Sequence, residues 1–240
     1  KTLNYIGLLS YLRNRPADGI PAYEAAEHQL LRVLKESPDN SEATLTLGGV
    51  YSNHANSVRA TNPAASLALF DRAEGVLAPL SNSTPPWVGA RRFHANAVRG
   101  RARALGMLGR NAESEQELKR GLTFALGVDR NELLSDLLRG RAQKGDETAL
   151  PELEKLARDR EATTTLRFNI AQSMGALAGA VKRTEGAEQA ASAALAHLRE
   201  LKYEGYFRSP MNMRILRQSP MLDSVRRRAE FEELLRTTGP

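Results

Sequence analysis

Arginine side chains that share one face of a predicted helix are the residues of this sequence best suited to binding chemistry. Arg92 and Arg99 lie seven residues apart in a continuous helical pattern over 87–108, so the helical period places both on the same stripe. Guanidinium groups bind carboxylates or phosphates through paired hydrogen bonds, and crowding them concentrates positive potential. The stripe therefore indicates a candidate surface for an acidic ligand. The plain alternative is that Arg suits an exposed helix face.

Other reactive residue types form no catalytic or metal-binding pattern. The four histidines have no tight ligand spacing such as HExxH, and we expect surface or cap positions for them. No GxSxG nucleophile motif is present. Carboxylates are scattered along helical segments, where pairing with Arg four residues away is the ordinary explanation. The sequence has no Cys, which excludes disulfides and thiolate metal sites. We expect no catalytic residues, no metal and no cofactor.

Composition favours a helical protein without a membrane span. Of the 240 residues, 41% are hydrophobic and 5% aromatic, and the abundance of Ala, Leu, Arg and Glu favours helix. No run of about 18 apolar residues exists. The net charge of +6 is mild; it fits a solvated surface or an acidic partner, and nucleic acid is unlikely because no aromatic and basic platform is present. The sequence leaves the location open between the cytoplasm and the soluble region of a membrane-anchored protein.

Breaker residues divide the chain into helical segments. The segment NRPADGIP, residues 14–21, predicts a turn, and Asn62 followed by Pro63 predicts a helix start. We expect helices over 3–12, 22–36, 45–59, 63–80, 87–108, 112–124, 132–144 and 148–158, then around 169–174, from a turn at 184–186 to 201, over 211–218, and finally up to 235.

Small and aromatic residues recur at spacings that let two helices approach closely. Leu47 and Gly48 precede Tyr51, and Phe70 follows in the next segment with small residues on either side. This pattern resembles the tetratricopeptide repeat, a two-helix unit of about 34 residues. The resemblance implies an all-α fold, a tetratricopeptide-repeat-like α-α superhelix. We expect about five repeats over 1–204 and capping helices over 205–240.

The end of the sequence is too apolar for a free tail. Leu222, Phe231, Leu234 and Leu235 fall at spacings that a short broken helix would turn inward. A repeat array needs an element that covers its last apolar face. We expect this segment to fold back as a cap, with the arginines at 226–228 left mostly in solvent.

Four stretches carry a more specific family resemblance: residues 65–80, 90–122, 168–178 and 215–235, the last reading ILRQSPMLDSVRRRAEFEELL. Together they resemble the C-terminal helical-repeat region of large multidomain bacterial serine/threonine protein kinases. In that family the final stretch usually carries an acidic residue beside the proline, where this chain has Ser219.

The resemblance implies a docking or sensing region attached to a kinase domain that lies upstream, sometimes beyond a membrane helix. The chain itself contains no Gly-rich phosphate loop over a strand, no HRD catalytic loop and no DFG motif. Phosphoryl transfer needs these groups to hold Mg²⁺ and to orient the hydroxyl. We therefore expect no enzymatic activity from this chain, and whether a kinase domain lies upstream stays open.

The repeat resemblance also implies a concave groove lined by the first helix of each repeat. The register set by Gly48, Ala102 and Leu138 points a set of polar side chains into that groove, with Glu42 and Glu132 offsetting part of the positive charge. The candidate binding residues are Asn53, Arg92, Asn96, Arg99, Arg103 and Arg139.

These features favour a non-catalytic scaffold that binds a protein or peptide, with an acidic partner as one option. Two alternatives stay open. One is a regulatory sensor of a small anionic ligand, and the other is weak nucleic-acid binding through the Arg-rich surface, which predicts affinity that falls steeply with salt.

Overall fold

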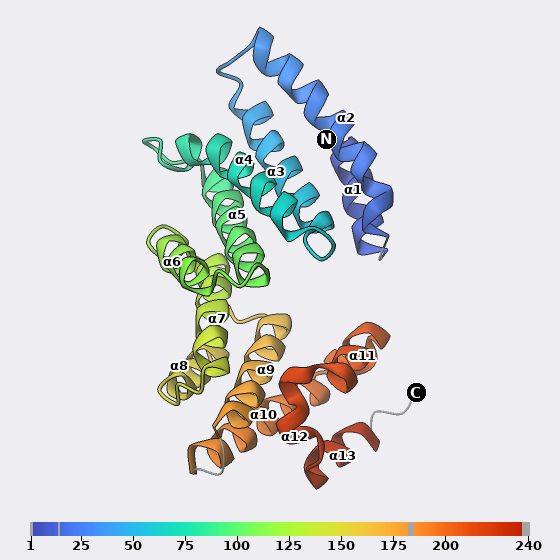
Figure 1. Ribbon diagram of the computed structural model, residues 1–240, viewed down its shortest axis with the longest axis vertical. Helices are drawn as coiled ribbons and strands as arrows, with labels where there is room; N and C mark the ends of the chain where they lie inside the picture. The colour runs from blue at the N-terminus through green and yellow to red at the C-terminus, as the bar shows by residue number, and fades with distance from the viewer. Residues whose placement is uncertain (1, 14, 182–184, 237–240) are drawn as a thin grey trace. The chain divides into compact units, whose positions relative to one another are not determined.

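The computed structural model describes residues 2–13, 15–181 and 185–236, and these residues form helices joined by short connections, with no strand among them (Figure 1). The predicted all-α class is confirmed for this part of the chain. Helix contacts divide the chain into two compact units, unit 1 (Lys1–Leu133) and unit 2 (Leu134–Pro240). The predicted division, into repeats over 1–204 and a cap over 205–240, concerns repeat units and not compact units, and it stays a prediction. Residues 237–240 of that cap and the expected turn residue Thr184 lie outside the described residues.

Unit 1 contains six complete helices and the start of a seventh in its described residues: α1 (Thr2–Leu12), α2 (Pro16–Glu36), α3 (Ser41–Val58), α4 (Pro63–Ser81), α5 (Val88–Met107), α6 (Asn111–Leu122) and the first part of α7 (Gly127–Gln143). The described residues of unit 2 contain the rest of α7, then α8 (Ala149–Ala157), α9 (Thr164–Ala180), α10 (Glu185–Tyr203), η1 (Tyr206–Arg208), α11 (Pro210–Gln218), η2 (Pro220–Leu222), α12 (Asp223–Arg226) and α13 (Ala229–Arg236).

Helix starts follow side-chain capping where the sequence supplies it. The Asn40 side chain accepts a hydrogen bond of 2.9 Å from the Ala43 amide, and the Asn62 side chain accepts one of 3.0 Å from the Ala65 amide. Each bond satisfies an amide that the first helical turn leaves unpaired. The predicted start of α4 at Asn62 and Pro63 is confirmed. Helix α5 starts differently, after an exposed Trp87 that makes no side-chain capping bond.

The turn predicted over residues 14–21 is wrong for its described part, because α2 already begins at Pro16 and continues through Pro21. Proline in the first helical turn removes an amide that has no helical partner there. Gly19 is not a breaker either, since it lies against α1: a Cβ at this position would be 2.7 Å from the Gly7 carbonyl oxygen. Asn14 lies outside the described residues.

Glycine notches hold the helices of unit 1 close together. A Cβ on Gly48 would overlap the buried Leu77 side chain of α4, which confirms the prediction that Gly48 lies where two helices touch. Phe70 of α4 is fully buried, and its ring occupies the space that a Cβ on Gly100 of α5 would need. The aromatic ring thus fills a notch in the following helix.

Unit 2 is organised around α9 and α10, whose apolar faces pack against each other and against the C-terminal segments. Leu222, Phe231 and Leu234 are buried in the same cluster as α9 and α10 residues, and Leu235 is partly buried against it. Two hydroxyls hold the segment in register. Ser219 Oγ donates to Gln172 Oε1 at 2.7 Å, and Ser224 Oγ donates to the Gly175 carbonyl at 2.6 Å. The inward direction predicted for these apolar residues is confirmed.

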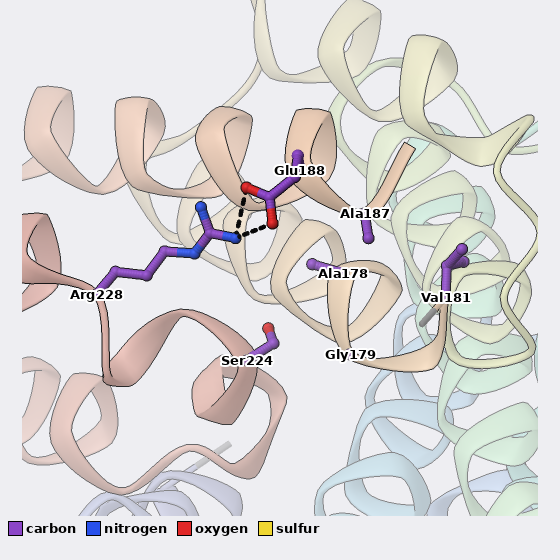
Figure 2. A pocket seen from close by; sticks show the side chains of 7 residues that line it. All are labelled: Ala178, Gly179, Val181, Ala187, Glu188, Ser224 and Arg228. Carbon is purple, nitrogen blue, oxygen red and sulfur yellow. Dashed lines mark hydrogen bonds and ion pairs between the residues drawn. The ribbon is translucent and has the colours of Figure 1, made fainter. Parts of the chain in front are cut away.

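The prediction that the arginines at 226–228 stay mostly in solvent is wrong for two of them, whose side chains are 34% exposed (Arg226) and 29% exposed (Arg228). Arg226 donates to the Ser219 carbonyl at 2.6 Å and also pairs with Asp223. Arg228 Nη2 bonds both carboxylate oxygens of Glu188 on α10, at 2.8 and 2.9 Å, beside the Ser224 side chain (Figure 2). Only Arg227 of the three is exposed. Arg226 thus links residues within the C-terminal segment, and Arg228 links that segment to α10.

Candidate functional site

Helices α1, α3 and α5 of unit 1 share one face. Asn53 Nδ2 on α3 donates a 3.0 Å hydrogen bond to Asn4 Oδ1 on α1. On the same helix α3, a Cβ on Gly49 would lie 3.7 Å from the Phe93 ring of α5 and 4.0 Å from Asn4 Nδ2. One turn earlier on α3, the Leu45 side chain lies 3.4 Å from the position that a Cβ on Gly89 of α5 would take. We call the surface around Asn4, Gly49, Asn53 and Phe93 the amide face.

Polar and apolar groups are mixed on the amide face. The Phe93 side chain is 40% exposed, which leaves much of its ring open to a ligand. The hydrogen bond between Asn4 and Asn53 uses one donor of Asn53 and one acceptor site of Asn4. An amide side chain has further donor and acceptor capacity, which stays available to a ligand. Gly49 itself is buried, and a Cβ at this position would stand at ordinary van der Waals distance from the Phe93 ring and the Asn4 amide.

Two predicted site residues lie on or beside the amide face. Asn53 is part of it, and Asn96, half-buried on α5, follows Phe93 by three residues, which the helical period places on the same side. Arg103 is half-buried further along α5.

The predicted arginine stripe is partly neutralised inside unit 1. Arg99 forms an ion pair with Glu132 of α7, so the predicted offset of positive charge by Glu132 takes the form of a direct contact. Arg92 is exposed, and it and Arg99 act on the nearby Asp129. Burial raises the pKa of Asp129, and the two arginines oppose that rise. Glu132 and Asp129 thus neutralise part of the positive potential of Arg92 and Arg99.

Arg139, the remaining predicted site residue, belongs to unit 2. It pairs at 2.9 Å with Asp136, one turn earlier on α7, whose side chain is almost fully buried. The amide face of unit 1 is therefore defined without Arg139.

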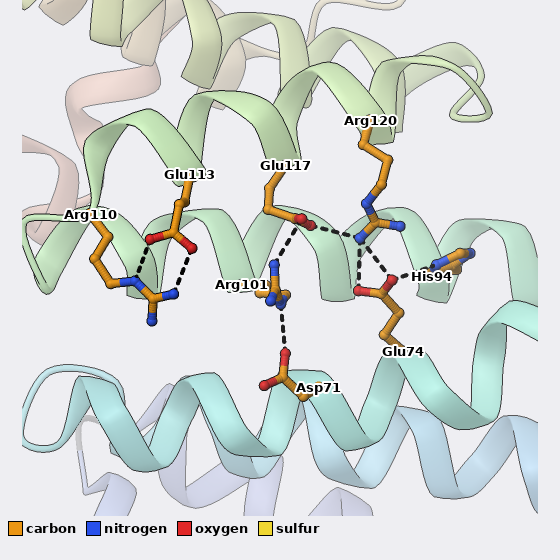
Figure 3. A network of polar contacts seen from close by, with 8 residues as sticks. All are labelled: Asp71, Glu74, His94, Arg101, Arg110, Glu113, Glu117 and Arg120. Atoms are coloured by element: carbon orange, nitrogen blue, oxygen red, sulfur yellow. Dashed lines mark hydrogen bonds and ion pairs between the residues drawn. The ribbon is translucent and has the colours of Figure 1, made fainter.

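A polar network on α4, α5 and α6 is the largest feature that sequence reasoning missed (Figure 3). Acidic and basic side chains alternate along it, around a shallow hollow of about 460 Å³. Its contacts in order are Asp71 to Arg101 at 2.6 Å, Arg101 to Glu117 at 2.8 Å, Glu117 to Arg120 at 2.6 Å, Arg120 to Glu74 at 2.8 Å, and Glu74 to His94 at 3.9 Å.

His94 ends this network in the interior, contrary to the expected surface or cap position. The side chain is buried and stacks on Phe124 with 4.5 Å between ring centroids. His94 and then Arg120 hold the pKa of Glu74 at about 2, against the opposing effect of burial. His197 is also buried, so the expectation fails there too, whereas His28 is exposed.

The alternating charges give the network a structural character. Each of the three carboxylates in the network, Asp71, Glu117 and Glu74, faces a guanidinium group. The residues that line the hollow include no nucleophile and no acid and base pair left without such a partner. Within residues 2–13, 15–181 and 185–236, no group of three or more His, Asp or Glu side chains is arranged to hold a metal ion.

Comparison with known proteins gives no match, either to a protein-family model or to a curated protein. In the part of the chain that the structure describes, no helix combines the length and the apolar character needed to cross a membrane.

Proposed function

We propose that this chain is a non-catalytic module that binds a protein or peptide along the amide face of unit 1. The observation that carries the proposal is the joining of α1, α3 and α5 through Asn4, Gly49, Asn53 and Phe93. A surface made by alternate helices is what a stack of helical hairpins presents, so the same contacts support a tetratricopeptide-repeat-like superhelix. The attachment to a serine/threonine kinase rests on sequence resemblance alone.

The chemistry of the amide face suits an extended peptide. Amide side chains can donate to peptide carbonyls and accept from peptide amides, which recognises a backbone whatever its sequence. The open Phe93 ring offers an apolar contact, and aromatic residues are common anchors at interfaces. The exposed Arg92 favours an acidic residue in the ligand, although Glu132 and Asp129 temper that preference.

The test is selection of random peptides on the whole chain, followed by affinity measurements on variants. We expect Gly49→Leu, whose side chain would displace the Phe93 ring and the Asn4 amide, and Asn53→Ala, which removes one amide, to weaken a selected peptide by about tenfold or more. Gly75→Leu is the matched control, because a Cβ on Gly75 of α4 meets nothing within 4 Å.

Three outcomes contradict the proposal. One is the absence of any selected peptide, and another is equal affinity for the parent chain and both amide-face variants. The third is phosphotransfer or hydrolysis by the purified chain, which would remove the non-catalytic part.

A further inference from the structure

Helix α1 of unit 1 carries an apolar stripe that faces solvent. Tyr5, Leu9 and Leu12 are 62%, 51% and 69% exposed, and Thr2 is exposed on the same side of the helix. The spacing of these four residues, three, four and three, is that of a coiled-coil seam, which packs against a matching helix. We call them the α1 seam. Ile6, which is 47% exposed, flanks the seam.

The corresponding face of α3 is covered by a helix. Gly7 of α1 and Gly48 of α3 have the same role, because each receives a large side chain from the helix that follows it. Two residues after Gly48, Val50 is 1% exposed and lies in a cluster with residues of α2, the helix before α3. Leu9 stands two residues after Gly7 and is half-exposed. The α1 seam is therefore part of a face on which this fold packs another helix.

The charges of α1 favour a second copy of the same helix as the partner. The segment Thr2–Leu12 contains no charged residue, so two copies related by a two-fold axis meet along it without bringing like charges together. The exposed Arg13 follows the seam. A parallel pair would place the two Arg13 side chains together, whereas an antiparallel pair separates them and opposes the two helix dipoles. An antiparallel pair is therefore favoured.

The exposed apolar area sets the strength of such a contact. Five side chains of α1 together offer roughly 500 Å² of accessible surface on each copy. They are Tyr5, Ile6, Leu9, Tyr11 and Leu12. Two copies therefore bury at most about 1,000 Å², which is close to the lower limit for a specific interface. This area fits a dimer in exchange with its monomer.

We propose that two copies of this chain dimerise through the α1 seam as an antiparallel helix pair. The two Leu9 side chains meet near the two-fold axis, and Tyr5 packs beside Leu12 of the partner subunit. The helical period places Asn4 on another side of α1. The α1 seam is thus separate from the amide face, and the dimer does not rest on the function proposed there.

The test is sedimentation velocity of the full chain over a range of concentrations up to about 200 μM. We expect the 26.4 kDa monomer to convert to a dimer with a dissociation constant of roughly 10–100 μM. Leu9→Arg should weaken dimerisation by about tenfold or more, because two like charges would meet near the axis. Leu9→Met keeps the apolar contact and should dimerise as the parent chain does. Val88→Arg, at a position of α5 that is 84% exposed, is the matched control and should also dimerise normally.

Disulfide cross-linking locates the contact, because the sequence has no Cys of its own. With copper–phenanthroline as the oxidant, Leu9→Cys should give a cross-linked dimer, since two residues near the axis lie within disulfide reach. Val88→Cys should stay uncross-linked. In an equimolar mixture of the Tyr5→Cys and Leu12→Cys chains, an antiparallel pair should give the mixed disulfide in excess of its statistical share.

Other results overturn the proposal. A chain that stays monomeric at about 200 μM would show that the α1 seam does not bind a second copy. Dimerisation that survives Leu9→Arg would place the contact elsewhere, and an excess of like-with-like disulfides in the mixture would show a parallel pair. If the chain is monomeric but binds a synthetic peptide of residues 16–36, and Leu9→Arg abolishes that binding, the seam accepts an amphipathic helix of another origin.

Discussion

The two units build their helix contacts in different ways. In unit 1, large side chains enter glycine notches on a neighbouring helix: Tyr23 at Gly7, and Leu77 at Gly48. In unit 2, the long helix α10 buries alanines, among them Ala190 and Ala194, against α9. The close glycine contact of α9, at Gly175, is made to the C-terminal segment and not to the helix next in sequence. Helix packing in unit 1 thus depends on individual side chains that fit against a glycine of the helix next to theirs in sequence.

The core of unit 2 is closed by residues far along the chain. Phe168 of α9 meets the Tyr206 and Phe207 rings at centroid distances of 5.4 and 5.5 Å. Leu222 and Phe231 are fully buried in the same cluster. The comparison teaches that a local substitution should disturb unit 1 most, whereas unit 2 should respond most to loss of its C-terminal segments.

Truncation after Gly205 should give the largest effect. It removes six large buried side chains, each of which contributes about 1.5–3 kcal/mol when buried, offset by the ordering of the segment. The lost residues are Phe207, Leu216, Leu222, Val225, Phe231 and Leu234. We expect a lower melting temperature, and faster amide exchange in α9 and α10 than in the full chain.

Exchange in α3 and α4 of unit 1 is the internal reference for that measurement. A truncated chain that stayed soluble, with unchanged melting temperature and exchange, would show that the terminal segments do not close unit 2.

Gly48→Ala should give an intermediate effect in unit 1. The new methyl group would overlap the Leu77 side chain, and overpacking of this kind costs about 1–3 kcal/mol of unfolding free energy. Gly75→Ala on α4 is the control, because a Cβ there meets nothing within 4 Å, and better helix propensity should stabilise it by up to about 1 kcal/mol. Chemical denaturation of both variants measures the difference. Equal unfolding free energies for the two variants would show that the close contact at Gly48 does not set the stability of unit 1.

The smallest effect concerns the pH dependence of unit 1. Glu74 has its pKa lowered to about 2 in the folded chain from an ordinary value of 4.5. Its stabilising contribution is therefore fully present above about pH 4.5 and is lost as the pH falls through about 2. After allowance for solvent screening, we expect this contribution to be roughly 1–2 kcal/mol.

Glu74→Gln should flatten the dependence of unfolding free energy on pH between these limits, while the exposed Glu36→Gln should not. Identical pH profiles for Glu74→Gln and the parent chain would show that the network does not hold Glu74 ionised.

Much of the helical plan could be read from local sequence. The cap at Asn62 and the small residue Gly48 are signals carried by one or two residues, and the structure bears out both. The breaker types of Pro16 and Gly19 predict a turn where α2 begins, because local sequence does not show that Pro16 fits a first helical turn and that Gly19 fits against Gly7. Local spacing does not show which helix a glycine will face.

The candidate site was accessible from sequence only in part. The repeat register predicts Asn53, and the same register applied at Gly7 also points to Asn4. The network could not be found in this way, because Asp71 and Arg101 are 30 residues apart and meet only when α4 packs on α5. Ion pairs between helices depend on rotation about the helix axes, which residue spacing within one helix does not set.

The exposed Trp87 at the start of α5 has a consequence for optical work on this chain. It is the single tryptophan of the sequence, and it belongs to unit 1. Its emission therefore reports the surroundings of the loop before α5, whereas the indole-free unit 2 has only Tyr203 and Tyr206 as ultraviolet fluorophores besides its phenylalanines. The chain carries a natural label on one of its two units, so melting curves followed by tryptophan emission and by circular dichroism can differ without any added dye.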